Sequence, residues 1–130
     1  MRRAVVGAVA LSLFLAGCDG GGPQPGTLTV TFAGAQTARS AKFRVVGPVT
    51  GVNLPNGSAL TLVSEPLAGD TTIFAVFAAV GDSLNGVVVA TVAVPDVHAA
   101  GAYHAQVLQV ASPIYSLLTA SQYTLTVARQ

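Results

Sequence analysis

The sequence predicts an all-β fold for residues 27–130, namely an antiparallel β-sandwich of about seven strands. Apolar and polar residues alternate along several segments, as they do in strands with one buried face. Turn-forming pairs such as Asn56-Gly57 and Gly69-Asp70 separate these segments. No segment has the spacing of an amphipathic helix, apart from a single turn near residues 113–118. An up-and-down barrel is the competing architecture.

The first two predicted strands alternate most regularly. A strand over residues 27–32 turns its leucine, valine and phenylalanine inward and its threonines toward solvent. A second strand over residues 41–46 turns Phe43 and Val45 inward and its two cationic residues outward. Both strands are therefore expected to have one face in the core and one in solvent.

A hairpin is expected in the segment that follows. Asn56-Gly57 is a preferred sequence of type I′ turns, and it lies between two short apolar segments, 52–54 and 59–63. These two segments would therefore pair with each other. Glu65-Pro66 and Gly69-Asp70 then mark a loop, because proline and glycine interrupt regular strands.

Four longer strands complete the prediction. Two of them, over residues 72–80 and 86–94, are rich in valine, alanine and phenylalanine and are joined by a turn at 81–85. The last two are expected over residues 103–110 and 122–128. The final strand again alternates threonine with apolar residues, so the chain would close with a half-buried strand.

Both faces of the strands at 72–80 and 86–94 are apolar. A two-layer sandwich buries only one face of a strand, so the other face needs a cover. A loop would supply the cover, or small alanine and valine side chains would tolerate solvent. Our hypothesis is instead an apolar surface that docks a partner or a second copy. It places this surface at Phe74, Val76, Val87 and Val89.

Residues 1–17 have the layout of a secretory signal peptide. Arg2 and Arg3 precede an apolar run over residues 4–16. As a helix this run would rise only about 20 Å, whereas the hydrocarbon core of a bilayer is roughly 30 Å thick. The run is therefore too short for a comfortable membrane span, and we expect it to be cleaved off.

The segment Leu15-Ala16-Gly17-Cys18 resembles the lipobox of bacterial lipoproteins. The resemblance implies that a diacylglyceryl group is attached to the thiol of Cys18 and that the mature chain begins there. Cys18 is the only cysteine, so it has no partner for an intramolecular disulfide. Two acyl chains anchor a protein stably. The expected location is therefore extracytoplasmic, lipid-anchored to the cell membrane or the outer membrane.

Residues 18–26 are expected to form the lipidated cysteine and its tether. Their glycines confer flexibility and their prolines discourage strand pairing. Eight such residues span only about 15 Å, so the domain would sit close to the bilayer. Asp19 follows the cysteine, but it does not decide between the two membranes.

The charge of the predicted mature chain is close to zero. After removal of residues 1–17, four cationic side chains stand against five carboxylates, a formal charge of −1. Nucleic-acid binding requires a basic surface, and this balance does not supply one. Membrane contact is therefore expected through the lipid anchor.

The chemistry-bearing side chains form no recognisable motif. Hydrolase signatures such as G-x-S-x-G are absent from the sequence. His98 lies in a predicted loop, and His104 has the parity of the solvent face of its strand. Asp70, Asp82 and Asp96 fall in separate loops and lack the dense spacing of a calcium loop, although they would meet if those loops shared one end of the sandwich. We expect no enzyme, no cofactor and no metal site.

The C-terminal half resembles cohesin-like sandwich modules, whose size is that of an immunoglobulin-like domain. The resemblance is carried by GVVVATVAVPD at 86–96, YHAQVLQVA at 103–111 and YTLTV at 123–127. It implies a non-catalytic recognition module. It transfers no dockerin-contacting residue to this chain.

These observations predict a lipid-anchored, non-catalytic β-sandwich that serves as a protein-interaction or structural module of the cell envelope. The alternative is a lipoprotein that binds a carbohydrate or another small ligand. A sugar site uses exposed aromatic rings, and the tyrosines available are Tyr103, Tyr115 and Tyr123. Tyr115 follows Pro113 in a predicted loop and is the expected ligand contact.

Overall fold

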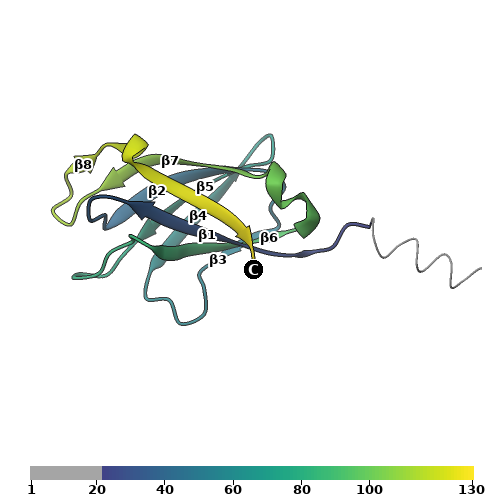
Figure 1. Cartoon of the computed structure of the whole chain (residues 1–130), viewed down its shortest axis with the longest axis horizontal. Helices are drawn as coiled ribbons and strands as arrows, with labels where there is room; N and C mark the ends of the chain where they lie inside the picture. Colours follow the sequence, from purple (N-terminus) through teal and green to yellow (C-terminus); the bar gives the residue numbers. More distant parts are fainter. Residues whose placement is uncertain (1–21) are drawn as a thin grey trace, which may run out of the picture.

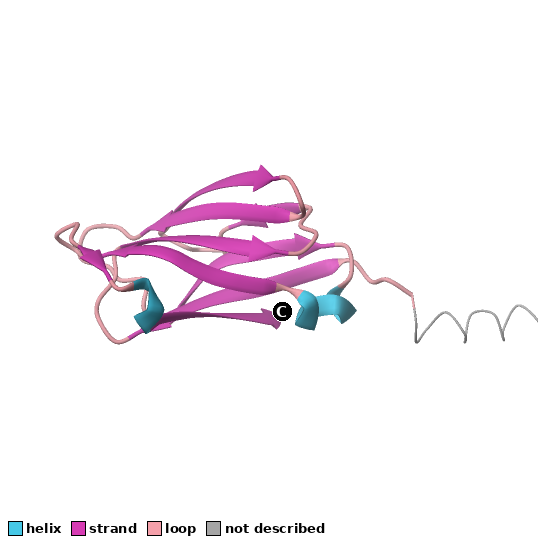
Figure 2. Ribbon diagram, turned by 90° about the horizontal axis from the view of Figure 1, so that it is seen from above, coloured by secondary structure: helices cyan, strands magenta, loops and turns pink. Residues whose placement is uncertain are grey.

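The computed structural model describes residues 22–130, which form two antiparallel sheets packed face to face (Figures 1 and 2). The predicted β-sandwich is therefore confirmed. Its strands in chain order are β1 (Gly26–Gly34), β2 (Ser40–Val46), β3 (Gly51–Asn53), β4 (Thr61–Leu67), β5 (Thr71–Phe77), β6 (Val87–Val94), β7 (His104–Ala111), β8 (Leu117–Leu118) and β9 (Tyr123–Arg129). Two short 3₁₀ helices, η1 (Val97–Ala102) and η2 (Ala120–Gln122), precede β7 and β9.

The strands divide into a four-stranded and a five-stranded sheet. The order is β3-β6-β1-β9 in the first and β4-β5-β2-β7-β8 in the second. Every connection therefore crosses between the sheets, except those from β4 to β5 and from β7 to β8. The strands predicted at 27–32 and 41–46 are confirmed as β1 and β2. Their predicted inward residues are buried and their threonines or cationic residues face outward, as does Val46 at the end of β2.

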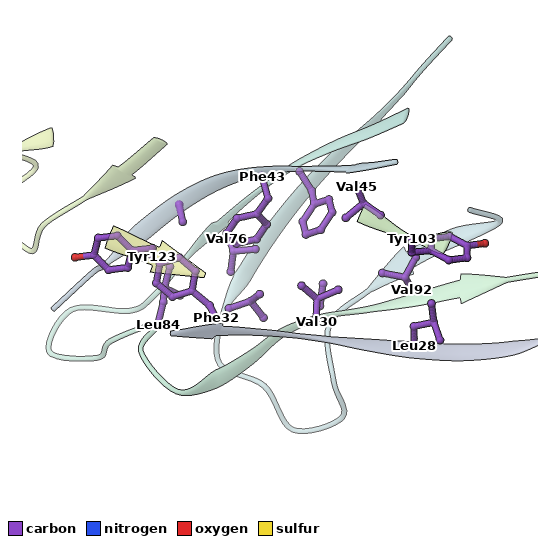
Figure 3. Packing of buried hydrophobic residues seen from close by; sticks show 14 of the residues in the cluster. Leu28, Val30, Phe32, Phe43, Val45, Val76, Leu84, Val92, Tyr103 and Tyr123 are labelled. Carbon is purple, nitrogen blue, oxygen red and sulfur yellow. The ribbon is translucent and has the colours of Figure 1, made fainter. Parts of the chain in front are cut away.

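The core lies between the sheets and is closed at its two ends by tyrosines (Figure 3). Tyr123 stacks on Phe32 with ring centroids 5.1 Å apart, and its hydroxyl donates to the carbonyl oxygen of Gln36. At the other end, the hydroxyl of Tyr103 donates to the carbonyl oxygen of Pro48. Each ring thus keeps its apolar body in the core while its hydroxyl finds a partner.

The Tyr103 ring also explains why residue 47 is a glycine. Gly47 has φ +140°, and a Cβ built there would lie 2.4 Å from the ring. A side chain at this position would therefore meet both backbone strain and a steric clash.

The apolar pattern of β6 is explained by a β-bulge. In the register with β1, Val30 lies opposite Ala90 and Thr31 opposite Val88, so Val89 is an extra residue. A bulge of this kind reverses the inward and outward alternation of the strand. Residues on both sides of the bulge therefore face the core, and the buried ones are Val89, Ala90, Val92 and Val94.

The hypothesis of an association surface at Phe74, Val76, Val87 and Val89 is wrong. Phe74, Val76 and Val89 are at most 1% exposed and belong to the core. Val87 is half-buried and lies on the same side of β6 as Val89. The pattern predicted a second apolar face because the period-two rule does not anticipate a bulge. The outward-facing side of β5 ends at Phe77, whose side chain is 45% exposed.

The predicted hairpin around Asn56-Gly57 is also wrong. β3 pairs with β6 and β4 pairs with β5, so the two segments lie in different sheets. The Ser58 amide donates to the Pro55 carbonyl at 3.1 Å, and Gly57 has φ +76°. Asn56 does not share this positive φ, which makes the turn type II rather than type I′.

The loop predicted at Glu65-Pro66 lies instead within the edge strand β4. An edge strand tolerates proline, because a backbone N–H that faces solvent has no ladder partner to lose. Gly69-Asp70 does form a turn as predicted, and it joins β4 to β5.

The N-terminal predictions lie mostly outside the described residues. The signal peptide at 1–17, Cys18 and the first tether residues fall in this part of the chain. Among the described residues, Gln24 is already fastened to the domain, because the Val97 amide donates to its carbonyl at 2.8 Å. The predicted tether at 18–26 therefore includes a residue that is hydrogen-bonded to the domain. No helix within residues 22–130 is long and apolar enough to cross a membrane.

Candidate interaction surface

The sandwich has two different ends. We call the end where β1 begins at Gly26 the proximal end, and the end where β1 stops at Gly34 the distal end. Figure 1 shows the chain entering the proximal end on the right, and the β7–β8 hairpin at the distal end on the left. The register places Ser40, Phe77 and Ala111 at the distal end, because they pair across β2, β5 and β7.

The exposed large apolar side chains gather on one sheet. Within residues 22–130, all of them lie on the outer face of the five-stranded sheet or in its distal connections, namely Val46, Val63, Leu67, Phe77, Val80, Ile114, Tyr115 and Leu117. Five of the eight are at the distal end. We call these five residues the apolar tip: Phe77, Val80, Ile114, Tyr115 and Leu117. Large apolar residues exposed together are unusual on a monomer and mark a contact surface.

The β7–β8 hairpin holds part of the tip in a defined conformation. The Ser112 amide donates to the Ser116 carbonyl at 2.9 Å, and the Tyr115 amide donates to the Ser112 carbonyl at 2.9 Å. The Ser112 hydroxyl oxygen accepts from the amides of Ile114 and Ser116. Tyr115 has φ +64°, a left-handed conformation that costs a bulky residue about 1 kcal/mol or more. Ser112 thus fixes a strained turn that displays Tyr115.

Arg39 connects this hairpin to the end of β5. Its guanidinium carbon lies 5.3 Å from the centroid of the Tyr115 ring, within the range of a cation–π contact. Its Nε donates to the Ala78 carbonyl at 3.2 Å. The two halves of the tip, one from each connection, are therefore held together by one cationic side chain.

A groove lies beside the tip on the outer face. Its volume is about 230 Å³. It lies between Phe77 on β5 and Leu117 on β8, and Ser40 on β2 and Ala111 on β7 separate these two residues. Lys42 is the charged residue in its lining. The groove is therefore mostly apolar, with a single ammonium group beside it.

Asn85, in the β5–β6 connection, supports the distal end. Its Oδ1 accepts from the Ala38 amide and the Ser83 hydroxyl, both at 2.8 Å. Its Nδ2 donates to the carbonyls of Gly34 at 3.0 Å and Gln36 at 2.7 Å. One amide side chain thus joins the β1–β2 connection to the β5–β6 connection, from which Val80 projects.

The three tyrosines differ in their exposure to solvent. Tyr115 is 69% exposed in the tip, whereas Tyr103 and Tyr123 are 8% and 5% exposed in the core. Burial raises the pKa of both core hydroxyls. Tyr103 and Tyr123 are therefore excluded as stacking surfaces for a sugar.

The histidines and aspartates are spread over both ends of the sandwich. His98 is in η1 and its Nδ1 lies 3.4 Å from Asp96 Oδ1, while His104 is exposed on β7. Asp70 and Asp96 are at the proximal end near Tyr103, and Asp82 is at the distal end. The three aspartates therefore do not meet. Within residues 22–130, no three His, Cys, Asp or Glu side chains form a candidate metal site.

Backbone contacts explain the pKa of Asp96. The amides of Gln24 and His98 donate to its carboxylate at 3.2 Å and 3.0 Å. These hydrogen bonds favour the charged form and lower the pKa of Asp96, the Gln24 contact most. Asp96 is thus a fastening point for the start of the domain.

Comparison of the chain with protein-family models, with curated proteins and with solved structures finds no match in any of the three. The candidate site is therefore identified from its geometry alone. Sequence reasoning identified Tyr115 but missed its neighbours Phe77, Val80, Ile114 and Leu117. The signal was present in SPIYSLL at 112–118, where four large apolar residues follow a turn-forming pair and belong to no predicted strand.

Proposed function

We propose that the protein is a lipid-anchored, non-catalytic module of the cell envelope that binds a partner protein through the apolar tip. The observation that carries the proposal is the position of the tip. Its five large apolar side chains are exposed at the end opposite the one where the chain enters β1. An N-terminal anchor at Cys18 would therefore leave the tip facing away from the bilayer.

The dimensions support this arrangement. The residues between Cys18 and Gln24 would span only about 12 Å as a flexible chain. A strand of seven to nine residues is about 25–30 Å long. With the proximal end held near the membrane, the tip would stand some 30 Å or more above it, where a partner can reach it.

The energetics of the tip suit protein binding. Burial of one leucine or isoleucine side chain contributes about 1.5–3 kcal/mol. The Ser112 hydrogen bonds and the Arg39 contact already order Tyr115, so a partner would lose less affinity to conformational entropy. A pre-ordered aromatic ring among aliphatic side chains has the composition of a binding hot spot.

Site-specific photo-crosslinking in native envelopes tests this function. A benzophenone amino acid at Tyr115 should give one discrete cross-linked product, and the same probe at Thr29, on the other sheet, should give none. The product should disappear in the double variant Ile114→Ser, Leu117→Ser. Equal products from both positions would contradict the proposal.

The anchor is tested separately. Metabolic labelling with a palmitate analogue should label the wild-type chain, and Cys18→Ser should abolish both the label and the membrane fractionation. Labelling that survives this substitution would contradict anchorage at Cys18.

Binding of a small hydrophobic ligand is the second candidate, favoured by the groove between Phe77 and Leu117. Its lining is mostly apolar, which suits an acyl chain better than a sugar. A glycan array and a fluorescent fatty-acid analogue distinguish these ligands. Saturable binding of the fatty-acid analogue that Leu117→Asp abolishes would favour this candidate over the partner protein.

A further inference from the structure

The sandwich has four edge strands, and three of them carry features that discourage pairing with another chain. β3 and β8 have only three and two residues, and β4 contains Glu65 and Pro66. β9 has seven residues, no proline, and a single charge at its last residue, Arg129. Among the described residues, β9 is therefore the edge most open to an added strand.

The register shows which backbone groups face this edge. The Gln130 amide donates to the Thr27 carbonyl at 3.2 Å, so these two residues form a hydrogen-bonded pair. Antiparallel strands alternate such pairs with pairs whose backbone groups point away from each other. Leu125 and Val127 lie opposite Phe32 and Val30 in the second kind of pair. Their N–H and C=O groups therefore point away from β1, toward the free edge.

A groove begins beside Leu125 and runs toward the start of β9 at Tyr123. It has a volume of about 580 Å³ and is lined by residues of β7, η2 and β9. Val107, Leu108 and Leu125 in its lining are only half-buried, and every lining residue is uncharged. β8 pairs only with the last two residues of β7, so it leaves most of β7 open on this side.

We propose that the free edge of β9 binds an extended segment of a partner protein, which adds to the four-stranded sheet as its fifth strand. The segment's backbone pairs with the outward N–H and C=O groups of Leu125 and Val127. Its alternate side chains enter the groove, and they are uncharged because no residue of the lining offers a charge to pair with. This surface is separate from the apolar tip.

A second copy of the chain fits this edge less well. Two identical β9 edges pair antiparallel about a two-fold axis, which points the proximal ends of the two copies in opposite directions. Copies anchored by short tethers in one membrane do not meet in this way. A second copy is excluded only if the chain is anchored as proposed. The outward backbone groups of β9 and the groove beside it do not depend on the anchor.

The test uses the full chain in detergent micelles and a peptide probe. The probe carries the β1 sequence GTLTVTFAG between terminal lysines, because β1 is the strand that β9 already accepts on its other side. Saturating peptide should slow amide hydrogen exchange at Leu125 and Val127 on the order of tenfold. Slowed exchange only at β4 or at the tip, or no binding, would overturn the proposal.

Substitutions at the edge separate backbone pairing from side-chain contact. Val127→Pro removes an outward N–H and should weaken peptide binding about tenfold or more, whereas the matched Val127→Thr keeps the N–H and should stay within about twofold. Leu125→Lys keeps the N–H but adds a charge to the groove, and it should also abolish binding. This variant decides the outcome if Val127→Pro fails to fold. Equal binding by wild type and all three variants would overturn the assignment.

Two further measurements identify the occupant. Analytical ultracentrifugation of the full chain should show a monomer, and a dimer that Val127→Pro dissociates would assign the edge to a second copy instead. The Cys18→Ser chain should bind the peptide with unchanged affinity. A failure of lipid labelling would therefore count against the anchor, and a failure of peptide protection against the edge.

Discussion

The outer faces of the two sheets differ in composition, although both belong to strands of the same fold. On the four-stranded sheet, the outward residues of β1 and β9 are mainly threonine, as in the pairs of Thr31 with Thr126 and of Thr29 with Ala128. On the five-stranded sheet, the outward residues include Lys42, Arg44 and the large apolar side chains. Threonine provides a methyl for strand packing and a hydroxyl for water, so the first face stays soluble without charges. The second face exposes large apolar groups instead, and this contrast supports the binding role proposed for the tip.

The largest expected loss of stability comes from a charge on the inner side of the four-stranded sheet at its bulge, compared with the same charge on the outer side. Val89 is fully buried, so Val89→Asp places an unpaired charge in the core and should cost more than about 4 kcal/mol, enough to prevent folding. Val88 lies opposite the outward Thr31, and Val88→Asp should cost less than about 1 kcal/mol. Denaturant unfolding of the pair measures the difference, and similar losses would contradict the bulge.

The next effect concerns the support that the β5–β6 connection gives to the distal end. Asn85→Ala removes four hydrogen bonds and leaves the Gly34 and Gln36 carbonyls without this donor. At about 0.5–1.5 kcal/mol each, the loss should reach roughly 2–6 kcal/mol. Thermal unfolding measures it, with Ser83→Ala, which removes only a subset of these contacts, as the milder control. A loss below that of Ser83→Ala would show that Asn85 is not the main support.

The hairpin of the five-stranded side should respond more locally. Ser112→Ala removes the hydroxyl acceptor of two amides and should cost about 1 kcal/mol. Faster hydrogen exchange is expected at Ile114 and Ser116, with little change in β1. Uniform acceleration throughout the domain would argue against a separately ordered tip.

A matched pair of surface substitutions compares the two faces directly. Ile114→Ser and Thr29→Ser each change an exposed or half-buried outward residue, and each should alter the free energy of unfolding by less than about 0.5 kcal/mol. Only Ile114→Ser should reduce cross-linking from Tyr115 in native envelopes. Equal reductions by both variants would remove the functional distinction between the faces.

The smallest effect is a pH dependence at the proximal end, far from the tip. The folded state lowers the pKa of Asp96, so its carboxylate stabilises the fold above the unfolded pKa, and this contribution is lost as the pH falls below about 4. Asp96→Asn should therefore lower the melting temperature slightly at pH 7, and the difference from wild type should shrink in acid. A difference that grows in acid would have the wrong sign.

Much of the fold was predictable because its signals are local. The alternation around Phe43 and Val45 correctly identified the inward side of β2, and the threonines of β1 and β9 marked their solvent side. The errors arose where pairing is not local. Asn56-Gly57 marked a turn correctly, but the partner of each flanking strand was decided by contacts with β6 and β5.

The candidate site was less predictable. Tyr115 was identified as an exposed aromatic residue in a loop, but its contact with Arg39 joins positions 76 residues apart in the chain. Phe77 was assigned to an apolar strand without a known outer side. Its exposure depends on which face of β5 meets the opposite sheet, and alternation alone leaves that choice open when both faces are apolar.

The sequence by itself determined the class of fold, the inward sides of the regularly alternating strands and the prediction of an anchor at Cys18, because each depends on neighbouring residues. The tertiary structure decided the reversal of side at the bulge in β6, the burial of Phe74, Val76 and Val89, and the gathering of the apolar tip from two distant connections. A bulge is set by register between strands, and a surface patch is set by which connections share an end of the sandwich. Both are properties of the packed sheets, so no single segment contains the information.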